Sequence, residues 1–172
     1  AELLIDPLTG VGSRRAFEER EAQEGEVFVL CDVDGLKWTN DHLGHAAGDA
    51  LLWVVGGVLG RFAEKDGAAT IFRLAGDEFA FVLVPHDEGV LWDRVGTLIG
   101  RLGRLRHAST TWRDAAGAEW GLSGAAVTWG EGVTLAEADA DLLAEKVRRL
   151  ETEERAPRGE RPPGLRVERG EA

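Results

Sequence analysis

Cysteine is nearly absent from this sequence, and methionine and tyrosine are missing altogether. The single cysteine, Cys31, excludes an internal disulfide, and so little cysteine is typical of a reducing compartment. We therefore expect a cytoplasmic protein. The sequence begins at Ala1 and contains no methionine, which predicts either processing or, as we favour, a piece of a longer protein with other domains.

Long apolar runs are also absent. No stretch of about 20 apolar residues, the length that spans a bilayer, occurs, and there is no signal-like segment. The 172 residues are 44% hydrophobic. This composition predicts one soluble domain with a real core and no membrane contact.

Positive charge is scarce as well. The 20 lysines and arginines face 31 aspartates and glutamates, so the net charge is −11. Broad binding to nucleic acid is excluded on this ground, because phosphate backbones require a basic face. Any anionic ligand must instead be held by a local cluster of cations or by a metal.

The apolar pattern predicts strands and helices in an order typical of an α+β domain. The expected elements are a strand over 28–33, a helix over 48–62, a hairpin over 70–83, a helix over 89–105, a second hairpin made by 109–113 and 120–129, and a helix over 135–150. We expect an antiparallel-rich central sheet flanked by helices. In the second element, Gly56 and Gly57 each cost about 1 kcal/mol against alanine, which is tolerable if they allow close packing.

Charge, proline and glycine dominate after Glu151. Such a composition disfavours a packed core, so this segment is expected to be loose. We therefore divide the chain into a folded domain of residues 1–154 and a loose, charged C-terminal tail of residues 155–172.

Three aspartates lie at expected strand ends. Asp32 and Asp34 close the first strand two residues apart, so their side chains share a face. If the hairpin pairs beside that strand, Asp77 lies opposite Asp32. Carboxylates so placed are suited to Mg²⁺ and phosphoryl transfer. Each aspartate alone is better explained as a turn residue, but three at strand ends favour the metal interpretation.

Several motifs carry a resemblance to a known family. They are DPLTGVGSRRAF (6–17), DVDGLKWTNDHLGHAAGD (32–49), RLAGDEF (73–79), LSGAAV (122–127) and ADADLLAEK (138–146). In this order and spacing they resemble the GGDEF domain, the catalytic domain of diguanylate cyclases, over residues 6–146. The resemblance implies a palm-like sheet related to nucleotide cyclases and polymerases. It also implies condensation of two GTP into cyclic di-GMP with release of pyrophosphate, hence a nucleotidyltransferase.

The resemblance also assigns the chemistry to particular residues. It implies that Asp32, Asp77 and the backbone carbonyl of Val33 hold Mg²⁺ or Mn²⁺, and that Glu78 deprotonates or orients the 3′-hydroxyl. The hairpin then places Asp77 on the metal. Gly76 lets the backbone approach the nucleotide phosphates.

Guanine and phosphate recognition are implied in the same way. Asn40 and Asp49 match the guanine-reading positions, since a carboxylate accepts from both guanine donors and adenine lacks that pair. By themselves the two would be interpreted as helix caps. Lys37 and Lys146 match the phosphate-binding lysines, although Lys146 alone would be interpreted as a surface lysine beside an apolar face. His45 also belongs to the pattern, as a structural hydrogen-bonding residue.

The sequence departs from the family pattern at four positions. Ala75 replaces the first glycine of the signature, at a cost of about 1 kcal/mol if that backbone needs a positive φ. Leu36 and Leu143 replace an aromatic residue and a tyrosine, and Leu150 stands near the place of an arginine. Candidates to substitute for that arginine are Arg148, Arg149 and Arg166.

Two alternatives to a cyclase stay open: a catalytically degenerate domain that binds GTP and regulates a linked domain, and a nucleotide-independent dimerisation module. If the domain is a cyclase, each copy holds one GTP and two sites must face each other in a homodimer. An upstream sensor or regulatory domain is the expected further partner.

A product-inhibition site is expected to be absent. Many relatives carry Arg-x-x-Asp before the signature, and the corresponding residues here are Asp66, Gly67, Ala68 and Ala69. An acid at the position of the arginine repels phosphates, and Ala69 has no acceptor for guanine.

Overall fold

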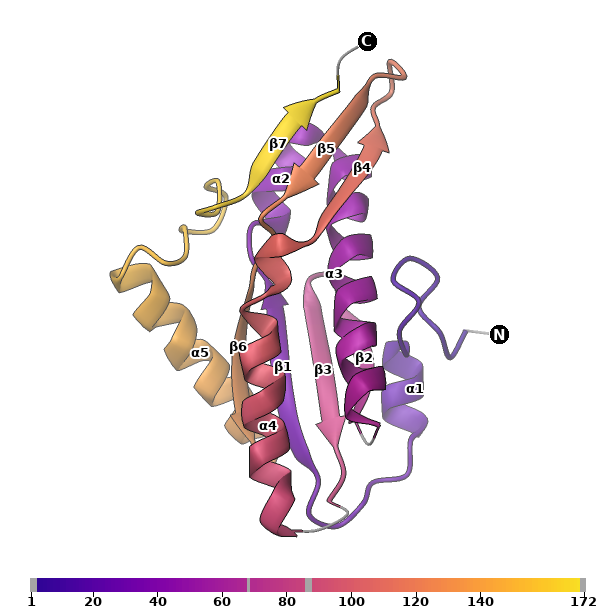
Figure 1. Cartoon of the computed structure of the whole chain (residues 1–172), viewed down its shortest axis with the longest axis vertical. Coiled ribbons are helices and arrows are strands. Elements are labelled where there is room, and N and C mark those ends of the chain that lie inside the picture. Colours follow the sequence, from indigo (N-terminus) through magenta and orange to yellow (C-terminus); the bar gives the residue numbers. More distant parts are fainter. Residues whose placement is uncertain (1–2, 68, 86–87, 171–172) are drawn as a thin grey trace.

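The structure is a computed structural model that describes residues 3–67, 69–85 and 88–170. A four-stranded antiparallel sheet with the order β2-β3-β1-β6 lies at its centre (Figure 1). Its strands are β1 (Val27–Val33), β2 (Ala69–Ala75), β3 (Glu78–Leu83) and β6 (Val127–Gly132). The α+β fold with an antiparallel central sheet is confirmed, as are the first strand and the hairpin around Gly76.

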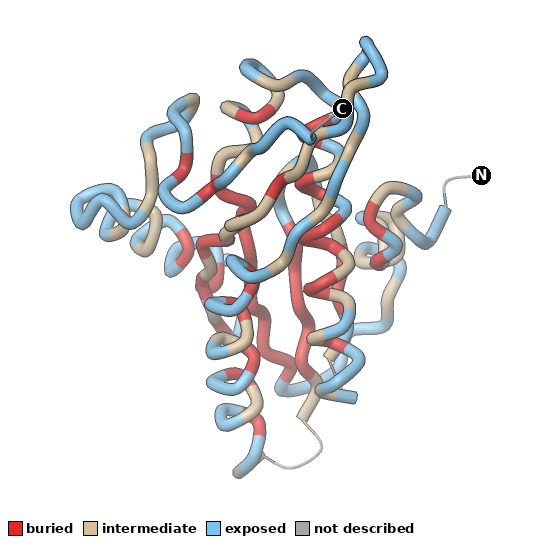
Figure 2. Tube along the Cα trace, turned by 45° about the horizontal axis from the view of Figure 1, so that its top comes forward, coloured by how far each residue is buried: buried red, intermediate tan, exposed pale blue. Residues whose placement is uncertain are grey.

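Helices cover both faces of this sheet. They are α1 (Arg14–Glu19), α2 (Leu36–Leu43), α3 (His45–Asp66), α4 (Glu88–Leu102), the 3₁₀ turn η1 (Leu105–His107) and α5 (Leu135–Glu151). In β1, Val29 and Cys31 pack with α3 and α4, whereas Phe28 and Leu30 pack with α5. This alternation buries β1 along its whole length, and the buried centre is visible in Figure 2.

The helix α3 extends beyond its predicted bounds at both ends. It ends at Gly67, which adopts the left-handed conformation (φ 75°) and donates its N–H to the Ala63 carbonyl. Gly56 lies against Thr9, where a Cβ would collide, while Gly57 has only Arg61 within 4 Å. The expectation of close packing therefore holds for Gly56 alone. By length and composition α3 is apolar enough to cross a membrane, but 56% of its most apolar window is buried inside this fold.

The second predicted hairpin is only partly right. β4 (Ser109–Arg113) pairs with β5 (Glu119–Ser123) across the expected turn. The predicted second strand, 120–129, is broken, however, because Gly124 turns the chain with φ 76°. The residues after the break enter β6, which pairs with β1 in the central sheet. The segment predicted as one hairpin therefore contributes strands to two different sheets.

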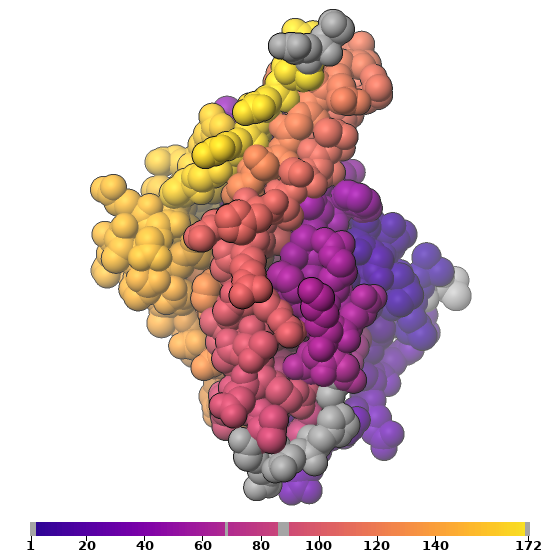
Figure 3. All heavy atoms as spheres, in the orientation of Figure 1, coloured from indigo at the N-terminus to yellow at the C-terminus, as the bar shows by residue number. Residues whose placement is uncertain are grey.

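The prediction of a loose tail is wrong for the described part of residues 155–172. β7 (Arg166–Arg169) pairs antiparallel with β5 and completes a three-stranded sheet with the order β4-β5-β7. Leu165 is buried in the main core, and Pro162 packs against Gly35. The space-filling view shows this segment lying along β5 (Figure 3). The division of the chain at residue 154 itself stays a prediction.

Candidate functional site

The aspartates lie in a cleft at one end of the central sheet. The cleft has a volume of about 810 Å³, and its walls come from the end of β1, the turn between β2 and β3, α2, α5 and residues 155–162. The predicted site residues that line it are Asp32, Val33, Lys37, Asn40, Asp77, Glu78 and Lys146. The end of β1 thus places Asp32 beside Lys146 and Arg155, which follow it in the sequence by more than a hundred residues.

The register of β1 against β3 differs by one residue from the prediction. Asp32 lies opposite Glu78 rather than Asp77. Asp77 is the residue before β3, and its backbone carbonyl accepts a hydrogen bond from the Val33 N–H at 2.9 Å. The β2–β3 pairing also shifts register between Arg73 and Ala75, and Asp77 lies in the turn between these two strands. Asp77 still reaches the same end of the sheet as Asp32.

Asp32 is buried, and its carboxylate pairs with two basic side chains of the same chain. The Lys146 ammonium lies 2.8 Å from its Oδ2, and the Arg155 guanidinium lies 2.9 Å from its Oδ1. Both contacts come from the C-terminal part of the chain. A buried carboxylate is costly unless it is paired in this way.

Asp34 belongs to the same cluster. Its Oδ1 accepts hydrogen bonds from Thr128 Oγ1 at 2.8 Å and from Arg155 at 2.7 Å. Arg149 approaches its other oxygen at 3.3 Å. Burial raises the pKa of Asp34, and the charges of Arg155 and Arg149 oppose that rise. Because one guanidinium binds Asp32 and Asp34 together, the prediction that their side chains share a face is confirmed.

Asp77 lies within the electrostatic reach of Asp32. Burial raises the pKa of Asp77, the negative charge of Asp32 adds to the rise, and Lys146 and Arg155 counter it. The pair therefore favours a bound cation. Both residues offer carboxylate oxygens, the donors that Mg²⁺ prefers, and substrate phosphates commonly complete its coordination. No group of three or more His, Cys, Asp and Glu side chains that could hold a metal occurs among the residues that the structure describes. The pair therefore fits a metal shared with a phosphate ligand.

The turn that carries Asp77 accepts alanine at position 75 without strain. Glu153 is the only residue other than glycine with a positive φ in the described ranges, so Ala75 incurs no left-handed penalty. A Cβ at Gly76 would meet no atom within 4 Å. Arg73 fixes the turn, since its guanidinium donates to the Gly76 carbonyl at 2.8 Å and to Asp6 at 3.2 Å.

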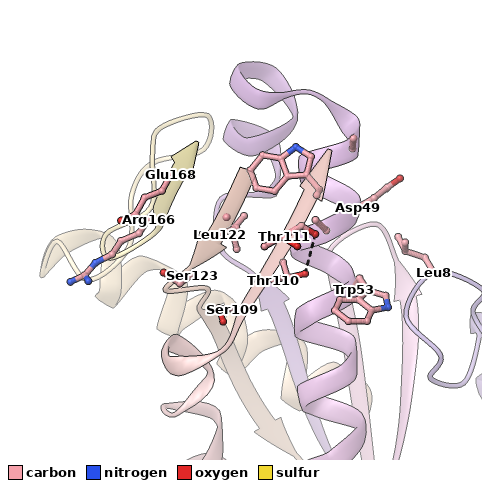
Figure 4. Close-up of a pocket in the computed structure, with 14 residues that line it drawn as sticks. Leu8, Asp49, Trp53, Ser109, Thr110, Thr111, Leu122, Ser123, Arg166 and Glu168 are labelled. Carbon is pink, nitrogen blue, oxygen red and sulfur yellow. Dashed lines mark hydrogen bonds between the residues drawn. The ribbon is translucent and has the colours of Figure 1, made fainter. Parts of the chain in front are cut away.

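Asn40 and Asp49, the two residues expected to bind guanine, line different cavities. Asn40 lines the cleft, and its amide oxygen occupies the space that a side chain at Gly48 would need. Asp49 is exposed on α3 and lines a neighbouring cavity with Trp53 and Leu8 (Figure 4). The structure therefore does not bring Asn40 and Asp49 into one cavity. His45, which precedes Asp49 by one helical turn, lines the cleft.

The basic residues also differ from expectation. Lys37 is exposed and pairs with Asp41 at 2.6 Å. Of the three proposed substitutes for the missing arginine, Arg149 reaches Asp34, whereas Arg148 pairs with Glu145 and Glu154. Arg166 does not line the cleft.

Sequence reasoning missed Arg155, which contacts both aspartates of β1. Its place just beyond the last helix, among other charges, gave no periodic signal. The available clue was that a buried acidic pair needs a cation from somewhere.

Comparison with known proteins gives a consistent result. The family model described as "Diguanylate cyclase, GGDEF domain" matches residues 3–110, more than half of the chain. Diguanylate cyclase DgcN of Escherichia coli is 38% identical over 88 residues, which are 46% of this chain and 21% of that protein. The chain thus spans a small part of that relative's length.

Solved structures show the same likeness across most of the chain. The GGDEF domain of TpbB from Pseudomonas aeruginosa matches 84% of this chain and 89% of its own with 26% identity and a TM-score of 0.60. Diguanylate cyclase SiaD of the same species, solved with its activator SiaC, matches 84% of this chain and 58% of its own with 29% identity and a TM-score of 0.59. Because residues 1–110 make up less than two thirds of the chain, a match that covers 84% of it must include residues beyond 110.

Proposed function

Because the chain belongs to the GGDEF family, we propose that it is a diguanylate cyclase, which condenses two GTP into cyclic di-GMP and releases pyrophosphate. The observation that carries the proposal is the cleft in which Asp32 and Asp77 face Lys146 and Arg155. Carboxylates for a metal and cations for phosphates stand there side by side. Relatives named diguanylate cyclase support the same activity.

In this proposal Asp32, Asp77 and the Val33 carbonyl hold the divalent ion, Mg²⁺ or Mn²⁺. The ion, when bound, neutralises charge on the reacting α-phosphate and lowers the pKa of the attacking hydroxyl. Glu78, exposed at the cleft and opposite Asp32, orients the 3′-hydroxyl or takes its proton.

Lys146 and Arg155 change partners when substrate binds. Both cations line the cleft and would bind the triphosphate, while Asp32 would hold the metal. Arg155 then supplies the fork of donors that an arginine near Leu150 would give in other family members. Lys37 joins them from α2, once it leaves Asp41.

Guanine is bound through Asn40 and Asp49. Asp49 is exposed, and its carboxylate makes no hydrogen bond among the residues that the structure describes, so it can accept from the N1–H and the amine of guanine. Since Asp49 borders the next cavity, binding of GTP requires the base to lie across the α2–α3 junction. His45 stays a structural residue there.

Turnover requires a homodimer. Each domain holds one GTP, and each 3′-hydroxyl attacks the α-phosphate in the other domain, so two clefts must face each other. A sensor or regulatory domain elsewhere in a longer, cytoplasmic protein would bring two copies together. No nucleic acid or membrane is needed as a partner.

A second candidate function is a degenerate domain that binds GTP without turnover. The observation that favours it is the pairing of both Asp32 oxygens with cations of the chain, which opposes metal binding. A nucleotide-independent dimerisation module would leave the cleft without a role.

One experiment separates these functions. The purified chain is incubated with GTP and Mg²⁺, and the products are identified by chromatography and mass spectrometry. Cyclic di-GMP and pyrophosphate are expected. GTP that binds but stays intact identifies the degenerate domain, and absence of GTP binding identifies the dimerisation module.

A further inference from the structure

A second pocket lies on the other side of Arg149 from the cleft. Its volume is about 540 Å³, within the range of small-ligand sites. It is bounded by η1, the turn between β5 and β6, the last part of α5, and residues 163–166. No role in the proposed cyclase reaction falls to this pocket.

The pocket is held in shape by close backbone packing. Gly124 has a φ of 76°, and a Cβ there would collide with the Gly164 carbonyl. Only glycine therefore lets the segment before β7 lie directly on the β5–β6 turn. Leu165, next to this contact, is buried in the main core. The wall formed by residues 163–166 is thus anchored to the fold.

The lining is strongly positive in a protein of net charge −11. Arg106, Arg148, Arg149 and Arg166 face two glutamates, so the four arginines exceed the acids by two charges. Both glutamates, Glu145 and Glu154, pair with Arg148. The remaining positive charge is therefore not balanced within the pocket.

Two of the arginines have no acidic partner. Arg106 contacts only the neighbouring His107 ring, at 3.4 Å, and no ion pair of Arg166 occurs in the described part of the chain. Arg166 lines both this pocket and the cavity of Figure 4, where its side chain points away from Asp49 and Trp53. Trp129 adds an aromatic wall. The guanidinium groups of Arg106, in η1, and Arg166, in β7, are therefore suited to bind a doubly charged tetrahedral anion.

We propose that this pocket is a second ligand site that binds a phosphate group between Arg106 and Arg166. A phosphate monoester or free phosphate carries a charge near −2 at neutral pH, which matches the two guanidinium charges of Arg106 and Arg166. Guanidinium forks bind such oxygens through paired, charge-assisted hydrogen bonds. Arg149 connects the site to the cleft, because it lines the pocket while donating to Thr128 and approaching Asp34.

The test is binding, without GTP or metal, so that it is independent of cyclase activity. The chain is titrated with inorganic phosphate at constant ionic strength, and the Trp129 indole N–H resonance is followed. The resonance is assigned by its loss in Trp129→Phe. A saturable shift is expected; a shift that stays linear in phosphate concentration overturns the proposal.

Matched variants locate the site. Arg106→Gln and Arg166→Gln should each weaken phosphate affinity about tenfold, the loss of one charge-assisted contact. Arg104→Gln removes the same charge two residues away, outside the pocket, and should change affinity less than twofold. Equal weakening by Arg104→Gln and Arg106→Gln would mean general electrostatic attraction and would overturn the proposal. Lys146→Gln, in the cleft, should leave the Trp129 response intact.

A second ligand identifies the source of the phosphate. Glycerol 3-phosphate is titrated in the same way. Tighter binding than inorganic phosphate indicates a phosphorylated metabolite, and equal binding indicates free phosphate. Both results support the site. Failure of both ligands to shift the resonance overturns it, whatever the cyclase assay shows.

Discussion

The two walls of the cleft come from parts of the chain with different relations to the family. Asp32, Asp77 and Glu78 lie within residues 3–110, the part that the family model matches. Lys146, Arg149 and Arg155, which pair with the aspartates of β1, lie beyond it. The acids are set by a strand and a hairpin, whereas the cations arrive from a helix and an irregular segment. The acidic residues, the first wall, thus lie in the part of the chain that the family model matches, and the basic residues, the second wall, lie outside it.

Substitution in the acidic wall should have the largest effect on activity. In the proposed reaction Asp32 and Asp77 hold the metal, so Asp32→Asn and Asp77→Ala should each lower the rate of cyclic di-GMP formation by about 10³-fold or more. Initial rates with GTP and Mg²⁺ measure this. Circular dichroism must show an unchanged fold, and near-normal turnover in either variant would refute the role of this wall.

Asp49 tests whether the matched region also selects the base. Asp49→Ser should reduce the preference for GTP over ATP by about a hundredfold, because the serine hydroxyl no longer demands guanine's donor pair. Competition between the two nucleotides measures the preference. Exposed Glu64, on the same helix, provides a control as Glu64→Ser. If the parent protein already uses ATP equally well, Asp49 does not read the base.

The C-terminal part should matter for stability although its composition suggested a loose tail. Leu165→Ala removes a side chain buried in the main core and should lower the free energy of unfolding by about 2–4 kcal/mol. Urea denaturation measures the loss. Val167→Ala, at a half-buried position two residues on, should cost less. A loss below about 0.5 kcal/mol for Leu165→Ala would mean that the segment does not pack in solution.

Arg155 tests whether the second wall controls the first. Without nucleotide, Arg155→Gln should bind Mn²⁺ about tenfold more tightly, because a cation that competes for Asp32 and Asp34 is removed. With GTP present, the same variant should have a higher KM. Titration calorimetry and initial rates measure the two effects. Arg158→Gln, which removes a charge from the same segment and the same cleft, is the matched control. Unchanged Mn²⁺ affinity would show that Arg155 exerts no control.

The smallest effect concerns product inhibition. Asp66 is paired with Arg94, whose Nε lies 3.1 Å from its Oδ1, so an acid already neutralises the nearby arginine at this place. Ala68 of this predicted absent site lies outside the described residues. We expect cyclic di-GMP to leave the initial rate at saturating GTP nearly unchanged. Strong inhibition that GTP cannot relieve, and that Asp66→Ala alters, would contradict this.

The sequence predicted the acidic wall because its signals are local. A buried run ending in Asp32 and Asp34, and a glycine-containing hairpin before Phe79, follow from periodicity and turn chemistry. The predicted register of β1 against β3 was wrong by one residue, and the irregularity between Arg73 and Ala75 in the β2–β3 pairing was not predicted either. These errors moved Asp77 by one position without removing it from the site.

Lys146, in the second wall, was predicted from the family resemblance, whereas the strand β7 was not predicted because its position depends on distant contacts. Leu165 and Val167 alternate as strand residues do, but Pro162, Pro163 and Gly164 before them favoured an irregular tail. Val167 lies in β7, which pairs with the edge of β5, and Leu165 immediately precedes this strand. Arg155 was missed for a related reason: its partners precede it by more than a hundred residues. Family resemblance did not help there, because the usual arginine is elsewhere.

The buried Cys31 has a practical consequence for measuring assembly. Its side chain is fully buried, and burial together with the charge of Asp32 raises the pKa of the thiol far above its ordinary value. The thiol of Cys31 should therefore not react with maleimide reagents while the chain is folded. A cysteine introduced at exposed Arg158, on the rim of the cleft, would be the single site of attachment for a fluorophore or spin label. Distances between labels on two copies of the chain could therefore be measured without first replacing the native cysteine.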